Sequence, residues 1–282
     1  DSAVVAAVYS RILAPENLLL VNMPGPFTST TTIRLARKLA SNLGCLYTEI
    51  PIRQSARTTR AQIDGLTAAS RSRPLKQRLT LTDFMFENVQ SRDRGARVLA
   101  AVASAFGGVF TCNANKSEAT VGYSTLYGDL GGYFANIADL WKVEIYALAR
   151  HLNSAVYGRE VIPAGILSLT PSAELSPAQN VDENKGDPLI YPYHDCLFRR
   201  WVESWNRISP EEILEWYAAG RLEEEIGYTG RAADHFPAPA AFISDLERWW
   251  NQYRGMGVIK RIQALPVLAV TRRAFGFDYR ES

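Results

Sequence analysis

Apolar and polar positions switch between helical and strand spacing through the first 112 residues. Residues 3–13 and 30–43 place apolar side chains at helical spacing, and Gly44 marks the end of the second helix. Residues 18–21 form a continuous apolar run, which is typical of a strand buried on both faces. The same pattern predicts strands at 45–50 and 108–112 and helices at 55–69 and 81–106.

These elements follow one another as helix, strand, helix, strand, helix, helix, strand. Such an order favours the α/β class, with a parallel twisted sheet flanked by helices. Ligands of open parallel sheets bind beyond the carboxyl ends of the strands, which here means the segments that begin at Asn22 and Asn113. Residues 158–192 carry five prolines and only brief apolar runs, which predicts a long functional loop. The final third is helical in pattern and rich in tryptophan.

Composition narrows the class of protein without indicating a function. A length of 282 residues is near the upper limit for one hydrophobic core, so we expect a single domain over 1–282. The chain has 31 basic and 29 acidic side chains, a net charge of +2 and no basic block, which argues against nucleic acid as a partner. The longest apolar stretch, about 13 residues, is too short to span a membrane. Three separated cysteines and an N-terminus without signal-peptide features lead us to expect a cytoplasmic protein.

The segment after the first predicted strand has features of a phosphate site. Gly25 lies in a turn, and hydroxyl side chains from Thr28 to Thr32 open the next helix. A helix start offers unpaired N–H groups and a partial positive charge to an anion. Serine and threonine at a helix start are more often plain N-caps, so that alternative stays open.

The long predicted helix contains a polar segment, residues 87–94, inside an otherwise apolar pattern. Glu87, Arg92 and Arg94 span about two helical turns. A solvated face with intrahelical ion pairs explains them equally well on spacing alone.

Residues 111–132 hold the densest group of candidate functional side chains. A predicted strand runs directly into the amide of Asn113 and the carboxylate of Glu118, and a glycine-rich loop follows. Structural turns explain the glycines but not so many polar groups at the end of a strand. Carboxylate oxygens such as those of Glu118 suit Mg²⁺ beside phosphates. Lys142, on the next predicted helix, adds a positive charge.

Five motifs together resemble those of the NAD synthetase family, in particular the synthetase domain of its glutamine-dependent branch. They occur in the family's order and extend over nearly the whole chain. Each motif alone is weak evidence, and the shared order carries the resemblance. The motifs are Glu-Asn-x-Gln-x-Arg-x-Arg at 87–94, Asn-Lys-Ser-Glu at 115–118, Val-Gly-Tyr-x-Thr-Leu-Tyr-Gly-Asp at 121–129, Pro-Ser-Ala-Glu-Leu at 171–175, and Lys260-Arg261 with Arg-Ala-Phe-Gly at 273–276.

The resemblance implies an N-type ATP pyrophosphatase with an adenine-nucleotide-binding α/β fold. Members of this family use ATP and Mg²⁺ to adenylylate the carboxylate of nicotinic acid adenine dinucleotide, and they release pyrophosphate. Ammonia then displaces AMP to give NAD⁺. This chemistry depends on cations and N–H groups around the phosphates more than on an acid or a base. The lack of a Ser/His/Asp or Cys/His pattern near the motifs agrees with it.

Residue roles follow from the resemblance, position by position. Glu118 matches an acidic residue that contacts Mg²⁺ or substrate, and we expect Glu118 and Lys142 to be catalytic. Asn113 stands where the family often has a threonine, while Ser172 as a turn cap and Lys260 as a solvated charge are the structural alternatives. The expected ATP contacts are Gly25, Thr28, Ser29, Asn113, Lys142 and Ser172. The expected contacts to the deamido dinucleotide are Arg92, Glu118, Tyr123, Ser124, Thr125, Leu126 and Lys260.

The loop after the first strand departs from the family pattern. Where the family usually reads Ser-Gly-Gly-x-Asp-Ser, this chain reads Met23-Pro24-Gly25-Pro26-Phe27-Thr28. The two prolines remove N–H donors, and a phenylalanine cannot replace the aspartate as a ligand of Mg²⁺. Either the loop binds pyrophosphate in a substituted way, with Glu118 and the substrate phosphates holding the metal, or catalysis is impaired. Because the other motifs are retained, we favour an active synthetase.

The resemblance also carries expectations about partners. Glutamine-dependent members have an N-terminal glutaminase, and we expect none in this chain because the synthetase pattern begins close to its first residue. The chain is then either an isolated domain of a longer protein, with the glutaminase domain or subunit outside this sequence, or a form that uses free ammonia. A homodimer or larger homo-oligomer is implied, with the long helix from Leu81 and the tryptophan-rich region as candidate interfaces. The rival functions are a non-catalytic dinucleotide-binding module and an ATP pyrophosphatase that amidates another carboxylate.

Overall fold

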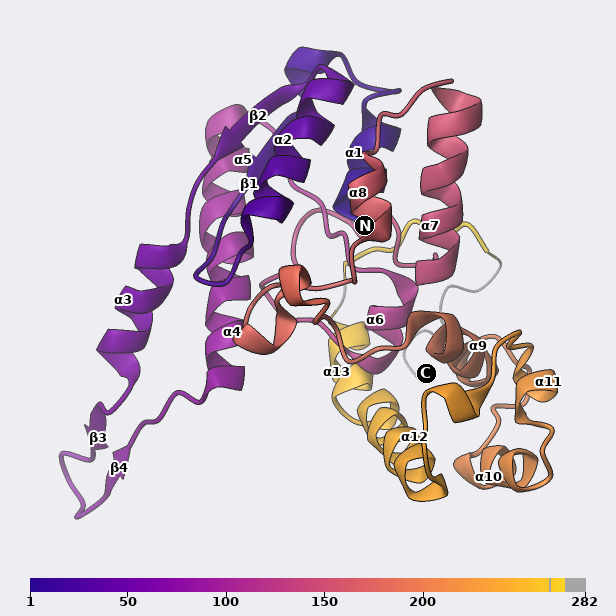
Figure 1. Cartoon of the computed structure of the whole chain (residues 1–282). Helices are drawn as coiled ribbons and strands as arrows, with labels where there is room; N and C mark the ends of the chain where they lie inside the picture. Colours follow the sequence, from indigo (N-terminus) through magenta and orange to yellow (C-terminus); the bar gives the residue numbers. More distant parts are fainter. Residues whose placement is uncertain (264, 272–282) are drawn as a thin grey trace.

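A small parallel sheet lies at the centre of the α/β part of the molecule (Figure 1). The computed structural model describes residues 1–263 and 265–271. In it, β1 (Leu19–Asn22) pairs in parallel with β2 (Leu46–Glu49) along all four residues. The α/β class with a parallel sheet and flanking helices is confirmed. The residues of β1 are half-buried, so the expectation of a strand covered fully on both faces is wrong.

The helix between these strands has the predicted length. α2 (Thr30–Leu43) packs against both β1 and β2 and buries Leu35 and Leu39. The Ser29 hydroxyl caps it by accepting a hydrogen bond from the N–H of Thr32 at 3.1 Å. Gly44 ends it with a φ of 68°, a conformation that favours glycine.

The third predicted strand, at 108–112, is not a strand. Within the described residues, Cys112 forms only an isolated parallel bridge with Ala135. The Cys112 N–H donates to Phe134 O at 3.1 Å, and the Ala135 N–H donates to Pro266 O at 2.9 Å. This apolar run therefore pairs with distant segments of the chain and not with β1.

A hairpin replaces the second half of the helix predicted at 55–69. α3 (Arg53–Ile63) ends early, and β3 (Thr67–Ala69) then pairs antiparallel with β4 (Lys76–Arg78). Gly65, with a φ of 81°, takes the chain out of the helix. The hairpin extends away from the body of the molecule (Figure 1).

The long helix that follows is confirmed in position but is not uniform. It consists of α4 (Asp83–Arg92), a π-helix (Asp93–Leu99) and α5 (Ala100–Phe106). Thr82 caps its start, and Gly107 ends it with a φ of 71°. Single π-helical turns inside α-helices are frequent at functional sites.

The other elements of this part are short. The long loop predicted before residue 192 is confirmed, because its only α-helix within the described residues is α8. The remaining helices are α1 (Ser2–Tyr9), a 3₁₀ turn (Pro15–Asn17), α6 (Lys116–Val121), α7 (Lys142–His151) with a π-helical end (Leu152–Val156), α8 (Ala164–Ser168), and 3₁₀ turns at Pro177–Gln179 and Val181–Glu183.

The final third is helical, as predicted, and forms its own aromatic core. Phe198 stacks on Trp201 with ring centroids 5.1 Å apart, and Trp249 is also buried. Trp201 and Trp249 are therefore core residues and not interface residues, whereas Trp205 is 75% exposed. No helix in the described part of the chain is long and apolar enough to cross a membrane. The elements are α9 (Tyr191–Val202), α10 (Pro210–Ala218), α11 (Leu222–Ile226), a 3₁₀ turn (Ala232–Asp234), α12 (Pro239–Arg254) and α13 (Met256–Ile262).

Candidate active site

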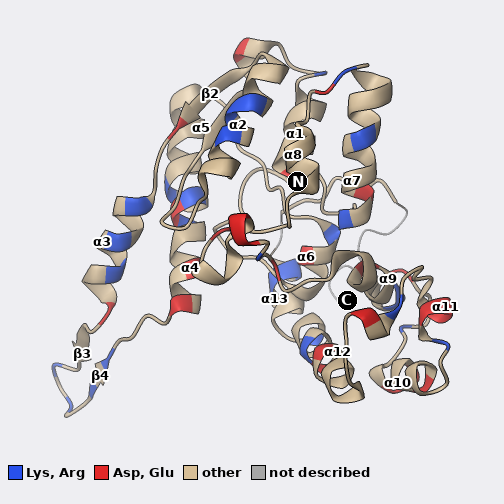
Figure 2. Cartoon of the chain, in the orientation of Figure 1, with Lys and Arg blue, Asp and Glu red and all other residues tan. Residues whose placement is uncertain are grey.

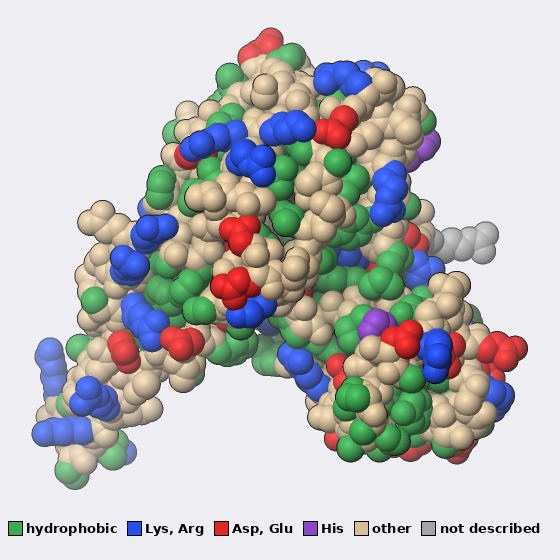
Figure 3. All heavy atoms as spheres, in the orientation of Figure 1, with side chains coloured by type: hydrophobic (Ala, Val, Ile, Leu, Met, Phe, Trp, Pro, Cys, Tyr) green, Lys and Arg blue, Asp and Glu red, His purple; other side chains and the backbone are tan. Residues whose placement is uncertain are grey.

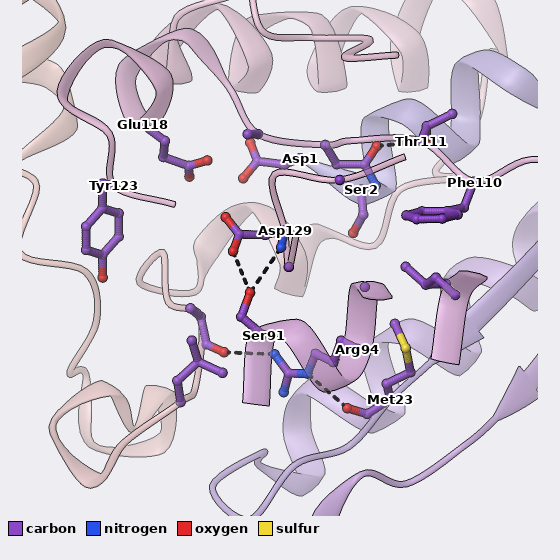
Figure 4. Close-up of a pocket in the computed structure, with 18 of the residues that line it drawn as sticks. Asp1, Ser2, Met23, Ser91, Arg94, Phe110, Thr111, Glu118, Tyr123 and Asp129 are labelled. Carbon is purple, nitrogen blue, oxygen red and sulfur yellow. Dashed lines mark hydrogen bonds between the residues drawn. The ribbon is translucent and has the colours of Figure 1, made fainter. Parts of the chain in front are cut away.

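A cavity of about 370 Å³ lies within the first 187 residues, on the α/β side of the molecule. Its walls come from the segment after β1, the α4–π-helix segment, α6, the start of α7 and the loop before α9 (Figure 4). Five of the predicted site residues line this cavity together: Asn113, Glu118, Tyr123, Lys142 and Ser172. The structure thus brings together residues from three of the sequence motifs and from α7.

Glu118 is held at the start of α6. Its carboxylate accepts a hydrogen bond from the Asn115 N–H at 3.2 Å, and the Asn115 side chain accepts one from the Glu118 N–H at 3.0 Å. This capping box fixes the direction of the side chain. The Lys142 ammonium lies 3.9 Å from the carboxylate and 2.6 Å from the Asp1 carboxylate. Burial raises the pKa of Glu118 above its ordinary value.

A second carboxylate faces the same cavity. The Tyr191 hydroxyl donates to Asp187 at 2.9 Å and lies 3.3 Å from Glu118, so it bridges the two acidic groups. Tyr123 donates to Asp187 at 3.2 Å and accepts a hydrogen bond from Gln179. Neither Asp187 nor Tyr191 was predicted as a site residue. Both lie at the end of a loop whose path no local pattern reveals.

The motif at 121–129 packs directly on the long helix. Ser91 donates to the Asp129 carboxylate at 2.5 Å and accepts from the Asp129 N–H at 3.0 Å (Figure 4). Burial raises the pKa of Asp129. Gly95, in the π-helix, allows this approach, since a Cβ there would lie 2.2 Å from the Gly128 carbonyl oxygen. Gly95 could have been recognised from the sequence, because a glycine inside a helical pattern often marks a position of close packing.

The loop after β1 reaches the cavity only through Met23. The Gly25 N–H donates to Thr28 Oγ1 at 2.9 Å, and the Ser29 hydroxyl is used as the cap of α2. The Ser29 N–H donates to the Glu174 carboxylate at 3.1 Å. None of Gly25, Thr28 and Ser29 is among the residues that line the cavity, where this loop contributes Met23. The alternative that the hydroxyls serve as caps is therefore correct for Ser29.

Arg94, which lines the cavity, and Glu174 both form hydrogen bonds with the loop after β1. Arg94 is buried and donates to Met23 O at 3.2 Å, Ala173 O at 3.4 Å and Thr28 Oγ1 at 3.4 Å (Figure 4). Burial lowers the pKa of Arg94. Glu174 is 4% exposed and has a φ of 49°, a strained conformation for a residue other than glycine.

Three other predicted residues support the site from outside. Arg92 donates to Leu126 O at 3.2 Å, and Lys260 donates to Gly122 O at 2.6 Å and to Ser124 O. Lys260 therefore holds the loop at 122–126 and is not a solvated surface charge. Thr125, in the same loop, donates to the Asn88 side chain at 2.9 Å.

Ser172 has both of its predicted features. It lines the cavity, and its hydroxyl donates to Gln179 O at 2.7 Å and accepts from the Glu174 N–H at 3.1 Å. It therefore caps a turn beside the cavity. The last predicted motif, at 273–276, lies outside the described residues.

Sequence comparison places the chain among proteins of known type. A family model described as NAD synthase matches residues 1–219. The glutamine-dependent NAD(+) synthetase of Synechocystis sp. is 35% identical over 282 residues, which is 99% of this chain and 42% of that protein. The corresponding enzyme of Thermotoga maritima is 37% identical over 281 residues, again 99% of this chain and 42% of that protein. The chain thus spans less than half the length of these relatives.

Solved structures share the fold. A glutamine-dependent NAD(+) synthetase from Cytophaga hutchinsonii matches with a TM-score of 0.61 at 19% identity, over 88% of this chain and 35% of that one. An NMN synthetase from Francisella tularensis matches with a TM-score of 0.58 at 18% identity, over 82% of this chain and 84% of that one. The match of the family model to more than two thirds of the sequence, together with these relatives, shows that the chain belongs to the NAD synthase family.

Proposed function

We propose that this chain catalyses the ATP-dependent amidation of nicotinic acid adenine dinucleotide to NAD⁺. The reaction passes through an adenylylated carboxylate and releases pyrophosphate and AMP. The observation that carries the proposal is the convergence of Glu118, Lys142 and Asn113 on one cavity. Family membership indicates the class of reaction. The convergence of the motif residues on one cavity supports the proposal that this chain still catalyses it.

The cavity has the charges that adenylylation requires. Lys142 lines the cavity, where its ammonium, paired with the Asp1 carboxylate at 2.6 Å, supplies a positive charge for the negatively charged phosphates. Tyr191 positions the carboxylates of Glu118 and Asp187 through its hydroxyl. Arg94 lines the same wall with a buried guanidinium. Binding both substrates at this site would align the dinucleotide carboxylate with the α-phosphate of ATP.

The donor set fits Mg²⁺ that arrives with ATP. Mg²⁺ commonly binds through one or two carboxylates together with substrate phosphates and water. Glu118 and Asp187 offer carboxylate oxygens at the cavity and would hold it there. When bound, Mg²⁺ neutralises charge on the phosphates that leave as pyrophosphate. Asp1 and Lys142 also line the cavity, so the charges of this ion pair act on an ion bound there.

We assign to the residues of this chain the amidation step alone, with ammonia itself as the nitrogen donor. The curated relatives are glutamine-dependent by name, and this chain covers only 42% of their length. The purified chain should therefore use ammonium and not glutamine as its nitrogen donor. A comparison of the two nitrogen sources at equal concentration tests this assignment.

A catalytically impaired relative that binds ATP or the dinucleotide is the second candidate. The observation in its favour is the loop after β1, where Phe27 replaces an aspartate and the Ser29 N–H is already bound to Glu174. Such a protein would bind the deamido dinucleotide but gain no affinity for ATP from Mg²⁺.

One experiment separates the two candidates. The purified chain is incubated with the deamido dinucleotide, ATP, Mg²⁺ and a high concentration of ammonium, and NAD⁺, AMP and pyrophosphate are quantified. Equal amounts of the three products support the synthetase. Binding of the dinucleotide without product identifies the impaired relative. ATP consumption that the deamido dinucleotide does not stimulate would instead indicate another carboxylate substrate.

A further inference from the structure

Helix α9 carries a row of polar side chains on the side that contacts α6 and α7, the two helices that bring Glu118 and Lys142 to the cavity. The members of the row follow one another at a spacing of four residues, which places them along one side of a helix. Charged residues of both signs lie where the three helices come together (Figure 2). We call this row the α9 stripe, and its members are Tyr191, Asp195 and Arg199 in the helix and Glu203 at its C-terminal end.

Three consecutive residues of α6 each contact one member of the α9 stripe through polar groups. The pairs are Lys116 with Glu203 at 2.8 Å, the Ser117 hydroxyl as donor to the Asp195 carboxylate, and the Glu118 carboxylate with the Tyr191 hydroxyl at 3.3 Å. The whole first turn of α6 is therefore tied to one helix. Glu118 is the only one of the three that lines the cavity.

The start of α7 is held by the central pair of this arrangement. The Lys142 N–H donates to the Ser117 hydroxyl at 3.0 Å, and the Val143 N–H donates to the Asp195 carboxylate at 3.0 Å. Both N–H groups lie in the first turn of α7, where a helix offers them no partner of its own. The negative charge of Asp195 also suits the positive end of that helix. Ser117 and Asp195 therefore fix α6 and α7 relative to each other.

The ends of the α9 stripe reinforce the same arrangement. The Lys142 ammonium lies 5.0 Å from the centroid of the Tyr191 ring, a favourable position for a cation, while the hydroxyl of that ring lies beside Glu118. At the other end, the Trp141 indole N–H donates to Glu203 at 2.8 Å. The stripe thus contacts the two expected catalytic side chains directly at one end and holds their helices at the other.

Asp195 differs from the charged side chains of the surface. Figure 3 shows residues of both signs distributed over the outside of the molecule, whereas Asp195 and Ser117 are completely buried. Within the described residues, the groups that donate to Asp195 are a hydroxyl and an N–H, both neutral. Burial raises the pKa of Asp195 to about 6, so a charged Asp195 at neutral pH lowers the free energy of unfolding. Carboxylates with raised pKa values occur at functional sites as well as in structural networks.

We propose that Ser117 and Asp195 are positioning residues for the amidation reaction, and that they hold Glu118 and Lys142 in one fixed arrangement at the cavity. This inference rests on the proposed function, because it concerns the two residues expected to be catalytic there. Neither Ser117 nor Asp195 lines the cavity, so each acts through its neighbour in the chain or across the helix start. A displacement of about 1 Å at a reacting centre can lower a rate about 100-fold.

Two variants and one control separate positioning from a purely structural role. Ser117→Ala removes the hydroxyl that joins α6 to α7, and Asp195→Asn removes the charge with almost no change of shape. The control is Asp245→Asn, which alters another carboxylate packed against α9. Asp245 accepts a hydrogen bond from the Trp249 indole N–H at 3.0 Å and lies 2.9 Å from Nε2 of His194, on a different face of α9.

NAD⁺ formation is measured at a temperature at which circular dichroism shows every variant to be folded. Ser117→Ala and Asp195→Asn should lower kcat about 10- to 100-fold, while KM for the deamido dinucleotide should stay within about threefold of wild type. Asp245→Asn should lose stability but keep kcat within about twofold. Hydrogen exchange measured by NMR should be faster at the Lys142 and Val143 amides in the first two variants only.

Several results would overturn the inference. They are a kcat near that of wild type in both variants, an equal loss of kcat in Asp245→Asn, and a raised KM with unchanged kcat, which would indicate lost substrate binding. Unchanged exchange at the Lys142 and Val143 amides would overturn it as well. If Asp195→Asn does not fold, the smaller change Ser117→Ala decides the outcome. A wild-type chain that forms no NAD⁺ with ammonium would contradict the proposed function, and amide exchange would then still test whether the pair holds α7.

Discussion

The segment after β1 and the segment after Cys112 contribute to the same cavity but use their polar groups differently. In the second segment, Asn113, Glu118 and Asp129 face the cavity. In the first, the hydrogen bonds of Gly25 and Ser29 are made to the chain itself. The number of hydroxyls in a loop therefore says little about ligand binding. What matters is which donors the surrounding residues leave available.

The cause of this difference can be traced to individual residues. Pro24 and Pro26 have no N–H to offer, and the Gly25 N–H is already bound to Thr28. Glu174 then takes the N–H of Ser29, at the positive end of α2. In the second segment the polar groups are positioned by neighbours behind them and remain open to the cavity.

The largest expected effect is at Glu118, in the segment that faces the cavity. Glu118→Gln should lower the rate of NAD⁺ formation by about 100- to 1000-fold, since a group that stabilises transition-state charge is lost while the capping box is kept. In the wild type, burial raises the pKa of Glu118, so kcat/KM should rise with pH through a value above the ordinary glutamate pKa of about 4.3. The variant should lose this acidic limb.

Asp182→Asn is the control for this measurement, because Asp182 is exposed and lies outside the cavity. It should retain the rate and the pH profile of the wild type. A Glu118→Gln variant with a rate within threefold of wild type would remove Glu118 from the mechanism and weaken the contrast between the two segments.

The next effect is on stability. Gly95→Ala should lower the free energy of unfolding by about 1–3 kcal/mol, because the new Cβ would lie 2.2 Å from the backbone oxygen of Gly128. Gly25→Ala, in the loop after β1, is the matched comparison. Its nearest atoms are the ends of the Gln90 and Arg94 side chains, at 3.1 and 3.2 Å, so the neighbours can move and the loss should be smaller. Urea denaturation measures both, and equal losses would contradict the difference in packing.

The smallest expected effect is at Glu174, which accepts a hydrogen bond from the Ser29 N–H in the loop after β1. Glu174→Gln keeps an acceptor for the Ser29 N–H but removes the negative charge at the start of α2. The affinity for pyrophosphate should rise about two- to fivefold, which corresponds to the few tenths to 1 kcal/mol that a charge at a helix terminus contributes. Calorimetry with pyrophosphate and Mg²⁺ measures it, and Glu183→Gln, exposed in the same loop, is the control. A loss of affinity would show that Glu174 itself assists binding.

The fold was predictable where the signals are local. The hydroxyl before α2 and Gly44 after it delimit that helix, and both act through neighbouring residues. The structure of the segment at 108–112 could not be predicted from local signals, because Cys112 forms its bridge with Ala135, in a distant segment. The hairpin was missed because its strands are short, charged and exposed, which removes the alternating pattern of a half-buried strand.

The same difference between local and distant signals separates the site residues that could be predicted from those that could not. Glu118 was predicted from its motif after a predicted strand and Lys142 from its position on the next predicted helix, and the structure places both at the cavity. Asp187 and Glu174 were not found as site residues, because their roles depend on how the loop before α9 folds back over α4 and the start of α2. Left-handed backbone at Glu174 has no signature in a sequence, since glutamate seldom adopts it.

The π-helix at Asp93–Leu99 gives the long helix one place where its length can change. Such a turn holds an additional residue while the α-helical stretches before and after it keep their faces. A deletion of one residue elsewhere in the helix would rotate everything beyond it by about 100°. The same deletion inside the π-helix would leave α4 and α5 packed as they are and would withdraw Arg94 and Gly95 from the cavity wall. A single lost codon at this point would therefore preserve the fold and change the cavity wall.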